Sequence, residues 1–353
     1  MHHDCKDYGG HVMTRRVRVE LGARSYDVVV GRGAIRELAS LIPTDAKRVA
    51  IVTQEGLPAE IASYLPTSVL VSRHVIGKSE EHKSMSTIER LCDEFAVAGL
   101  TRNDLIVGIG GGMVTDVAGF AAASWHRGVR VVHVSTTLVG MIDAAIGGKT
   151  GVNLRAGKNL VGAYWQPSGV ICDTAFLDSL PEREQRCGRG EMAKYHFLTG
   201  DDLLALDLDA RIARCVQIKA EIVGSDEREA GRRAILNYGH TLGHALEIAS
   251  DFALAHGESV AVGMMFAAHL ARALGRIDDA RVEHHRKVIV DHYGLSMSVP
   301  AGVRRDQLVE LMHHDKKAVD GLTFVLDGVH GIETVRGVEM SALSSAFTAL
   351  SVP

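Results

Sequence analysis

The chain has 353 residues, of which 46% are hydrophobic and 23% are charged, and its formal net charge at pH 7 is −4. This composition is typical of a soluble globular protein, and the length suits two domains. The small negative charge gives no reason to expect nucleic-acid binding, and no apolar run reaches the roughly 18 residues that a membrane span needs. The first residues show no apolar signal-peptide core, and the five cysteines show neither metal-ligand spacing nor a disulfide framework. We therefore expect a protein of the reducing cytoplasm.

Short runs rich in β-branched residues alternate with helical patterns in the first half of the chain. Residues 16–21 and 26–30 predict a hairpin-like start, and residues 83–98 predict a helix. This alternation predicts a mostly parallel sheet covered by helices, the architecture of a Rossmann-like nucleotide-binding α/β domain. Buried strands are expected at residues 47–53, 68–76, 104–110 and 129–135.

The pattern changes after about residue 173, where long apolar-periodic segments follow one another. Only residues 322–326 predict a strand in this half. We place the boundary within 173–180, so residues 1–175 are expected to form the α/β domain and residues 176–353 an all-α domain. The expected helices cover residues 203–223, 232–249, 256–274, 280–293 and 304–314.

Three glycines, Gly110 to Gly112, stand between a predicted strand and a predicted helix. Glycines here let the backbone approach a ligand closely, and the helix N-terminus offers free N–H groups to a pyrophosphate. The spacing differs from the G-x-G-x-x-G fingerprint of Rossmann domains. Asp116, in the first turns of the helix, either compensates the helix dipole or binds the nicotinamide side of a dinucleotide. The glycine turn alone leaves nucleotide binding open.

A second glycine-rich stretch, residues 143–167, carries Lys149, Asn153, Lys158 and Asn159. Lysines along such a stretch suit a phosphate or a polyhydroxylated ligand. The alternative is a flexible, solvated loop. The apolar residues between the polar ones argue against pure solvation, so we expect a ligand-binding loop.

Potential metal ligands occur in three segments of the second half: Glu191, the pair His240 and His244, and His256. One Glu and two His leave a fourth position open, which is the arrangement of catalytic zinc. Because His240 and His244 are four residues apart, they could share one face of a helix. Spacing alone does not choose between a two-histidine clamp and two histidines that make ordinary hydrogen bonds.

Nine motifs occur in order and together resemble the 3-dehydroquinate synthase family of the sugar-phosphate cyclases. The resemblance runs from about residue 14 to the C-terminus. It implies an N-terminal NAD domain, a helical C-terminal domain, a cleft between them, and a divalent metal, zinc or cobalt. The motifs are GGGMVTDVAGFAAASWHRGV, STTL, GGKTGVN, GKNLVGAYWQP, GEMAKY, IKAEIVGSDE, RAILNYGHTLGHALE, HGESVAVGM and DKK.

The resemblance assigns the metal to Glu191, His240 and His256 and moves His244 to the substrate. Asn237 and Arg233 then extend the same helical face. Lys316 or Lys317 of the DKK motif matches a further substrate position. The other residues matched to substrate contacts are Asp143, Lys194, Lys219, Arg233 and Asn237.

The resemblance also assigns NAD contacts and a dimer. Arg127 matches an arginine that reaches the site of a neighbouring subunit. The residues matched to NAD are Glu80, Lys83, Gly111, Gly112, Asp116, Thr136, Thr137, Lys149 and Lys158.

The implied reaction converts 3-deoxy-D-arabino-heptulosonate 7-phosphate to 3-dehydroquinate and phosphate, a carbon–oxygen lyase step of the shikimate pathway of aromatic amino acid biosynthesis. NAD oxidises a secondary alcohol, phosphate is eliminated, NADH restores the alcohol, and the opened ring closes to a carbocycle. Phosphate and carboxylate both need charge-assisted donors, which explains Lys194, Arg233 and a DKK lysine.

The motif EMAKYHF departs from the family because His196 stands where glycine is usual. The connection from Glu191 to IKAEIV is also short. Both features resemble amino-dehydroquinate synthases, which act on an amino analogue of the same sugar phosphate. His196 is either a specificity residue or a packing residue. The alternative from another class of enzyme is a metal-dependent NAD alcohol or glycerol dehydrogenase, which would accumulate NADH during turnover. A third possibility is an inactive binding protein on the same fold, which would lack bound metal.

Overall fold

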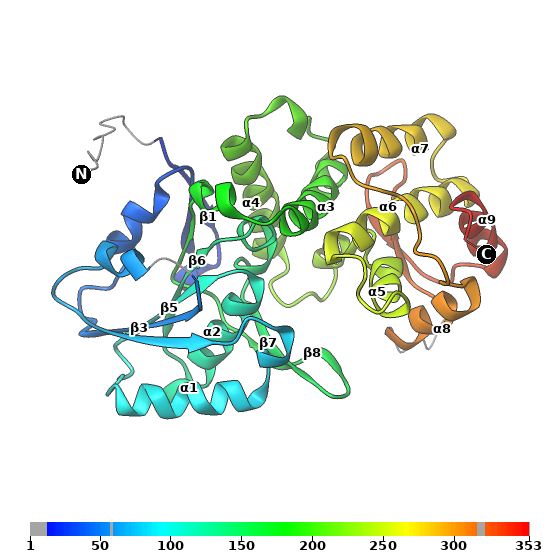
Figure 1. The fold of residues 1–353 in the computed structure, drawn as a ribbon. Coiled ribbons are helices and arrows are strands. Elements are labelled where there is room, and N and C mark those ends of the chain that lie inside the picture. Colours follow the sequence, from blue (N-terminus) through cyan, green and yellow to red (C-terminus); the bar gives the residue numbers. More distant parts are fainter. Residues whose placement is uncertain (1–12, 57–58, 316–321, 353) are drawn as a thin grey trace, which may run out of the picture.

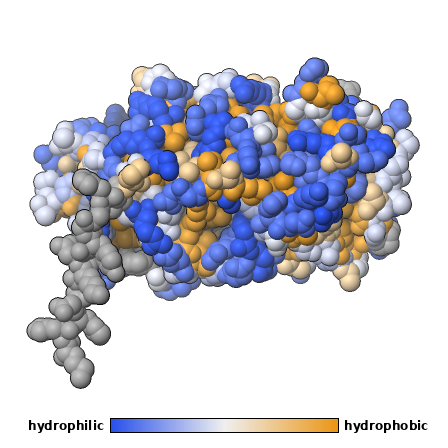
Figure 2. Space-filling model, turned by 90° about the horizontal axis from the view of Figure 1, so that it is seen from above, coloured by the Kyte–Doolittle hydropathy of each residue, from blue (hydrophilic) through white to orange (hydrophobic). Residues whose placement is uncertain are grey.

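The computed structural model describes residues 13–56, 59–315 and 322–352. An α/β half and a helical half lie side by side in an elongated body (Figure 1). Figure 2 shows one face of this body, where hydrophilic side chains predominate and hydrophobic ones are visible between them. No helix in the described ranges combines the length and the apolar character that a membrane crossing requires.

The first half contains a seven-stranded sheet with the order β1-β2-β9-β6-β5-β3-β4. The first pair, β1 and β2, is antiparallel, and every other neighbouring pair is parallel. The hairpin-like start and the four predicted strands are confirmed, whereas the short central strand β9 was not predicted. The strands are β1 (Arg15–Val19), β2 (Tyr26–Val30), β3 (Arg48–Gln54), β4 (Leu70–Ile76), β5 (Leu105–Gly110), β6 (Arg130–Ser135) and β9 (Gly169–Cys172).

Helices cover both faces of this sheet, which explains its apolar strands. Successive residues point to opposite faces: Val29 packs with Leu38 and Ile51, while Val28 packs into the core of the helical half. Both α1 and α2 pack on the face that carries Ala50. The covering elements in this half are η2 (Ala34–Leu41), η3 (Ala59–Tyr64), α1 (Met85–Val97) and α2 (Gly112–Ser124).

The second glycine-rich stretch is a hairpin and not the loop that the sequence predicts. After the turn η6 (Gly140–Ala144), strands β7 (Lys149–Leu154) and β8 (Gly157–Tyr164) pair antiparallel. A Cβ on Gly162 would lie 1.9 Å from the carbonyl oxygen of Thr150, and one on Gly151 would lie 2.7 Å from that of Val161. The glycines thus permit close approach of the two strands.

The second half is helical, as predicted, but it is not all-α, because strands β10 (Phe324–Leu326) and β11 (Glu333–Val335) form a small sheet. The sequence predicts β10 only. Helices α3 and α9 and this second strand were missed: α3 has few apolar residues, and β11 has only three residues. The helices are α3 (Glu182–Thr199), α4 (Leu208–Ser225), α5 (His240–Ala249), α6 (His256–Ala273), α7 (Asp279–Arg286), α8 (Arg305–Asp315) and α9 (Met340–Ala349).

The helix predicted at residues 232–249 is wrong in its first part. The chain forms the 3-10 helix η9 (Arg232–Asn237), breaks at Gly239, and begins α5 at His240. Gly239 has φ 82°, and a Cβ there would lie 2.7 Å from the carbonyl oxygen of Val260. The close packing of this turn on α6 therefore interrupts the helix, so Arg233 and Asn237 do not extend the face of α5.

One hydrophobic core joins the two halves. Val28 and Val30 of the sheet belong to the same buried cluster as Val216 of α4 and Phe266 of α6. The seven-stranded sheet ends at Cys172, and α3 begins ten residues later. The division of the chain at residue 175 into two domains stays a prediction. A continuous core of this kind holds residues from both halves at fixed positions around the site between them.

Candidate active site

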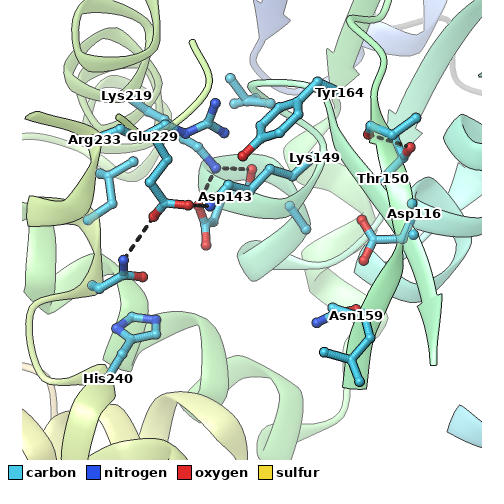
Figure 3. A pocket seen from close by; sticks show the side chains of 18 of the residues that line it. Asp116, Asp143, Lys149, Thr150, Asn159, Tyr164, Lys219, Glu229, Arg233 and His240 are labelled. Atoms are coloured by element: carbon cyan, nitrogen blue, oxygen red, sulfur yellow. Dashed lines mark hydrogen bonds and ion pairs between the residues drawn. The ribbon is translucent and has the colours of Figure 1, made fainter. Parts of the chain in front are cut away.

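A pocket of about 590 Å³ lies between the β7–β8 hairpin and the segments α3, α4, η9 and the start of α5. Figure 3 shows side chains from these segments pointing toward a common space. The structure therefore brings together residues that are up to 124 positions apart in the chain, from Asp116 to His240. The predicted site residues in its lining are Asp116, Asp143, Lys149, Lys194, Lys219, Arg233, Asn237 and His240.

Glu191 and Lys194 form a buried ion pair on one face of α3. Their spacing of three residues places both side chains over one turn, and Lys194 Nζ lies 2.6 Å from Glu191 Oε2. Glu191 is completely buried. Burial alone would raise the pKa of Glu191, but the charge of Lys194 and the neighbouring His240 outweigh it and hold this pKa well below its usual range. Glu191 is therefore a carboxylate.

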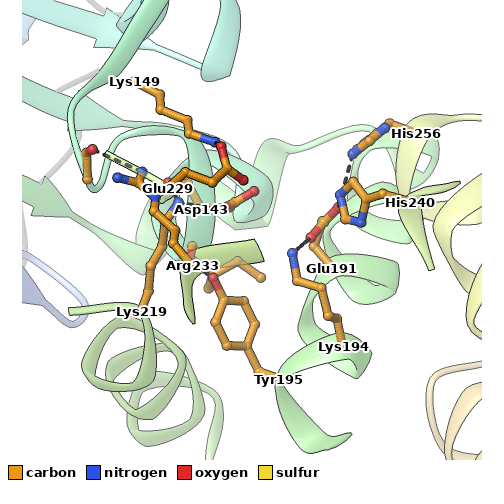
Figure 4. A network of polar contacts seen from close by, with 12 residues as sticks. Asp143, Lys149, Glu191, Lys194, Tyr195, Lys219, Glu229, Arg233, His240 and His256 are labelled. Carbon is orange, nitrogen blue, oxygen red and sulfur yellow. Dashed lines mark hydrogen bonds and ion pairs between the residues drawn. The ribbon is translucent and has the colours of Figure 1, made fainter. Parts of the chain in front are cut away.

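The second oxygen of Glu191 faces two histidines. Oε1 lies 3.3 Å from Nε2 of His240 and 3.0 Å from Nε2 of His256, and it has no hydrogen bond of acceptable geometry (Figure 4). A buried carboxylate oxygen that has such ion-pair contacts but accepts no hydrogen bond is costly. The three ligand atoms lie within 4.8 Å of one another. One carboxylate and two imidazoles around one point fit a divalent transition metal such as zinc or cobalt.

His244 takes a different position from His240. The two ring centroids are 5.4 Å apart and the rings are nearly perpendicular. His244 shares a second possible metal group with Glu247 and His256. Nδ1 of His256 lies 3.4 Å from Glu247, so that carboxylate can orient the ring. The geometry therefore supports separate roles for His240 and His244.

Two further pairs join the halves across the pocket. Lys219 of α4 donates to Asp143, and Lys149 of β7 donates to Glu229 (Figure 4). Burial lowers the pKa of Lys219 to about 8, although Asp143 acts in the opposite direction. For Asp143, the attraction of Lys219 outweighs burial and lowers the pKa. The pocket is thus lined by charges that already neutralise one another.

Glu229 is a pocket residue that the sequence analysis missed. Its Oε1 accepts a hydrogen bond of 2.9 Å from Asn237 Nδ2, while its other oxygen contacts Lys149. The stretch quoted for the resemblance ends two residues earlier, at Glu227. In the sequence, Glu229 is marked only by its position four residues before Arg233. Its contact with Lys149 of the distant β7 strand exists only in the folded chain.

Arg233 lies beneath the pocket and is only 1% exposed. Its guanidinium donates to the carbonyl oxygen of Gly147 at 3.0 Å and to that of Glu227, and its Nε has no partner among the described residues. A buried cation held by neutral carbonyl oxygens retains its full charge. It can therefore attract an anionic group that enters the pocket.

The predicted glycine cradle lies at the carboxyl ends of β5 and β6. These strands are neighbours, so Gly111 lies against Thr137, and a Cβ on Gly111 would come 2.9 Å from the Thr137 methyl group. Thr136 donates its N–H to Gly110. Helix α2 begins at Gly112 without a side-chain cap. Bare backbone N–H groups at this position fit a pyrophosphate.

Other residues predicted to bind NAD surround the hairpin. Lys83 donates at 2.5 Å to both Asp116 and Asn159. Burial raises the pKa of Asp116 to about 6, although Lys83 opposes this shift. Glu80 instead accepts from Asn153. Lys158 lies 4.1 Å from the centre of the Phe252 ring, so the hairpin reaches the turn that follows α5.

Two residues of interest, Arg127 and His196, do not line this pocket. Arg127 is exposed after the C-terminal end of α2, away from the glycine cradle, and its predicted contact with another subunit stays a prediction. Lys316 and Lys317 lie outside the described residues. His196 lines a separate cavity on the opposite side of α3. Direct contact between His196 and a substrate in the main pocket is therefore not supported.

Comparison with known proteins matches both halves of the chain. Residues 73–187 match the 3-dehydroquinate synthase N-terminal family, and residues 168–318 match the corresponding C-terminal family. A "Putative aminodehydroquinate synthase" of Amycolatopsis mediterranei is 51% identical over 327 residues, covering 92% of each chain. A 3-dehydroquinate synthase of Streptomyces coelicolor is 41% identical over 352 residues, covering 92% of this chain and 95% of its own.

Solved structures agree with these matches. A 2-deoxy-scyllo-inosose synthase complexed with carbaglucose-6-phosphate, NAD+ and Co2+ has a TM-score of 0.85 and 28% identity, covering 94% of this chain and 98% of its own. A 2-epi-5-epi-valiolone synthase of Streptomyces hygroscopicus with NAD+ and Zn2+ has a TM-score of 0.79 and 27% identity, covering 94% of this chain and 97% of its own. From the sequence matches over both halves, the chain belongs to the 3-dehydroquinate synthase family.

Proposed function

We propose that the protein is a carbocycle-forming, phosphate-eliminating cyclase that converts 3-deoxy-D-arabino-heptulosonate 7-phosphate to 3-dehydroquinate and phosphate. The observation that carries this proposal is one pocket in which Lys194, Lys219 and Arg233 adjoin the group of Glu191 and two histidines. Such a pocket can bind an anionic, hydroxylated substrate beside a metal. Relatives at 41% identity bear the name of this activity.

We propose NAD and a divalent metal, zinc or cobalt, as cofactors, because two structural neighbours contain them. Glu191, His240 and His256 would hold the metal, and the cradle at Gly111 and Gly112 would hold the NAD pyrophosphate. When bound, NAD supplies a reversible hydride acceptor and the metal supplies a Lewis acid beside the substrate hydroxyl.

The chain's own residues bind and orient the substrate. Arg233 and Lys194 carry buried positive charges that can hold its carboxylate and phosphate. Asn237 and His244 offer hydrogen-bonding groups to its hydroxyl groups. The pairs Lys219–Asp143 and Lys149–Glu229 can exchange partners when an anion enters. The β7–β8 hairpin lines one side of the pocket and would limit the access of water from that side.

A second substrate is favoured by one observation. The relative at 51% identity is named for the amino analogue of the reaction, whereas those named for the hydroxyl form are about 41% identical. The amino analogue differs by one substituent, and the same cationic side chains would bind its carboxylate and phosphate. We therefore propose amino-dehydroquinate synthase as the second candidate.

Side-by-side assays separate these functions. Purified protein with catalytic NAD and zinc or cobalt is given each heptulosonate phosphate, and phosphate release and NADH absorbance are followed. The proposal expects phosphate release without NADH accumulation, faster with the hydroxyl form. Faster release with the amino analogue would establish the second candidate, and steady NADH accumulation without phosphate would instead establish a dehydrogenase.

We also propose a cytoplasmic homodimer, since Arg127 matches an arginine that serves a neighbouring site. Its side chain is exposed. Mixing an Arg127→Ala variant with an inactive variant of the main pocket tests this. Recovery of activity in the mixture supports shared sites, and a monomeric mass in solution contradicts them.

A further inference from the structure

A second cavity, of about 670 Å³, lies outside the proposed active site. It opens between the C-terminal end of α3, the short helix η8 (Leu203–Ala205), helix α7 and the π-helical turn η10 (Lys287–His292). His196 follows Glu191 by five residues, which turns its side chain about 140° around α3. The two cavities therefore lie on different sides of the same helix.

The cavity has an excess of basic groups. His196, His284, His292 and Lys287 line it. Lys287 is exposed, and its side chain forms no hydrogen bond or ion pair with any residue of the described ranges. Burial first, and then the nearby His284, lower the pKa of His196 to about 4, so this ring is neutral.

Two of the other charged groups that line the cavity are paired with opposite charges, whereas Asp202 is bound by a neutral backbone donor. Arg281 contacts Asp327 at 2.6 Å, and Asp201 contacts Arg214 at 2.6 Å. Asp202 accepts the backbone N–H of Leu204. These contacts leave the lysine and the histidines to face a ligand, and both groups can donate hydrogen bonds.

His196 supplies an independent sign of a ligand. Its side chain lines the cavity, the residue is only 7% exposed, and its Nδ1 has no hydrogen-bond partner among the described residues. A buried polar atom in this state costs roughly 1–3 kcal/mol. A metal does not explain it, because in the described chain no three potential ligand atoms of this cavity lie within 4.8 Å of one another.

We propose that this cavity binds a small anion that carries a carboxylate or a phosphate group. The oxyanion accepts hydrogen bonds from Lys287 and from the imidazoles of His196 and His284. Each charge-assisted bond is short and strong compared with a bond between neutral groups.

The cavity is connected to the proposed metal group. Next to His284, His285 places Nε2 2.8 Å from the hydroxyl of Tyr238, which precedes His240 by two residues. The His285 ring also stacks on Phe197 of α3, with centroids 4.0 Å apart. An anion that moves α7 or the end of α3 thereby acts on segments that hold metal ligands.

Isothermal titration calorimetry of the full-length, metal-loaded protein tests binding. Inorganic phosphate and succinate serve as separate probes, which distinguishes the two kinds of anion. Two variants, the single Lys287→Gln and the double Lys287→Gln/His284→Gln, should each raise the Kd of one binding event by about tenfold or more. Lys47→Gln, an exposed lysine on the other half of the molecule, is the matched control and should bind like the parent.

Arg233→Lys separates this site from the main pocket, since it should leave the same binding event unchanged. Lys287 is exposed, so its replacement should keep the parent's denaturation midpoint. No binding of either probe to the parent protein, or equal binding by the double variant, overturns the proposal. So does loss of all binding in Arg233→Lys. None of these outcomes depends on turnover, so the proposed cyclase activity is judged separately.

Discussion

His240 and His244 share one helix, yet the structure gives them different neighbours. His240 faces the unpartnered oxygen of Glu191, and His256 from α6 faces the same oxygen. His244 belongs to the alternative group with Glu247. Both groups include His256, so replacing that residue cannot distinguish them. The choice depends on the two histidines of α5.

The first prediction concerns metal content. His240→Gln should lower metal affinity by more than the roughly 10- to 100-fold typical of an outer-shell replacement, because it removes a ligand atom. His244→Gln should retain the metal and lose turnover. The measurement is metal per chain by mass spectrometry after dialysis. If His244→Gln loses the metal while His240→Gln keeps it, the group with Glu247 is the metal site.

The second prediction concerns Lys219. Its pKa is lowered to about 8, first by burial, with Asp143 opposing the shift. The amine is therefore charged below this pH and neutral above it, so turnover should fall as the pH rises through about 8. Asp143→Asn removes the opposing charge and should move the fall to lower pH. The pH–rate profile measures both.

Lys219→Arg is the control for this prediction, since guanidinium stays charged over the whole range. Its activity, even if low, should show no decrease near pH 8. The same decrease in Lys219→Arg would assign it to another group.

At the scale of elements, the break before α5 positions the pocket. Gly239 has φ 82°, and a Cβ there would meet Met264 and Val260 of α6 at 2.7 Å. The turn directs Arg233 and Asn237 toward the pocket from a separate short helix, while α5 starts with His240. One glycine thus separates the residues proposed to contact substrate from the proposed metal ligand.

The third prediction is that Gly239→Ala destabilises the protein by at least about 2–3 kcal/mol, since backbone strain and a steric clash add together. Gly275→Ala is the matched control, because Gly275 has φ 68° but nothing within 4 Å of its Cβ position. It should cost only about 1 kcal/mol. Urea denaturation measures both. Equal losses would show that packing against α6 is unimportant.

Sequence periodicity predicted most strands and helices because their apolar faces are buried, but it failed where tertiary contacts decide. Strand β8 of the hairpin is exposed along most of its length, and Gly151 and Gly162 permit a strand approach that no periodicity records. The break at Gly239 depends on α6, which comes later in the chain. The family motifs identified their own residues as site candidates. Glu229 lies outside these motifs, and only the folded chain shows that it lies beside Lys149.

At the scale of the whole molecule, the pocket is assembled across one continuous core. Asp143 and Lys149 come from the α/β half, and Lys219 and Glu229 come from the helical half. The unpartnered Glu191 oxygen lies at the same place. A metal ion there would be attracted by the Glu191 carboxylate and would occupy its open oxygen, so metal binding should stabilise the fold and not only the reaction.

The fourth prediction follows from this coupling. A ligand that binds only the folded state stabilises it by about 4 kcal/mol at a concentration 1,000 times its Kd. Removing the metal with a chelator should therefore lower the Tm by several degrees, and zinc or cobalt should restore it. His240→Gln should begin at the lower Tm and respond to neither treatment. The counter-result is a parent Tm that stays the same after verified metal loss. It would show that the ion-pair contacts of Glu191 with its histidines are sufficient and that the metal contributes nothing to the fold.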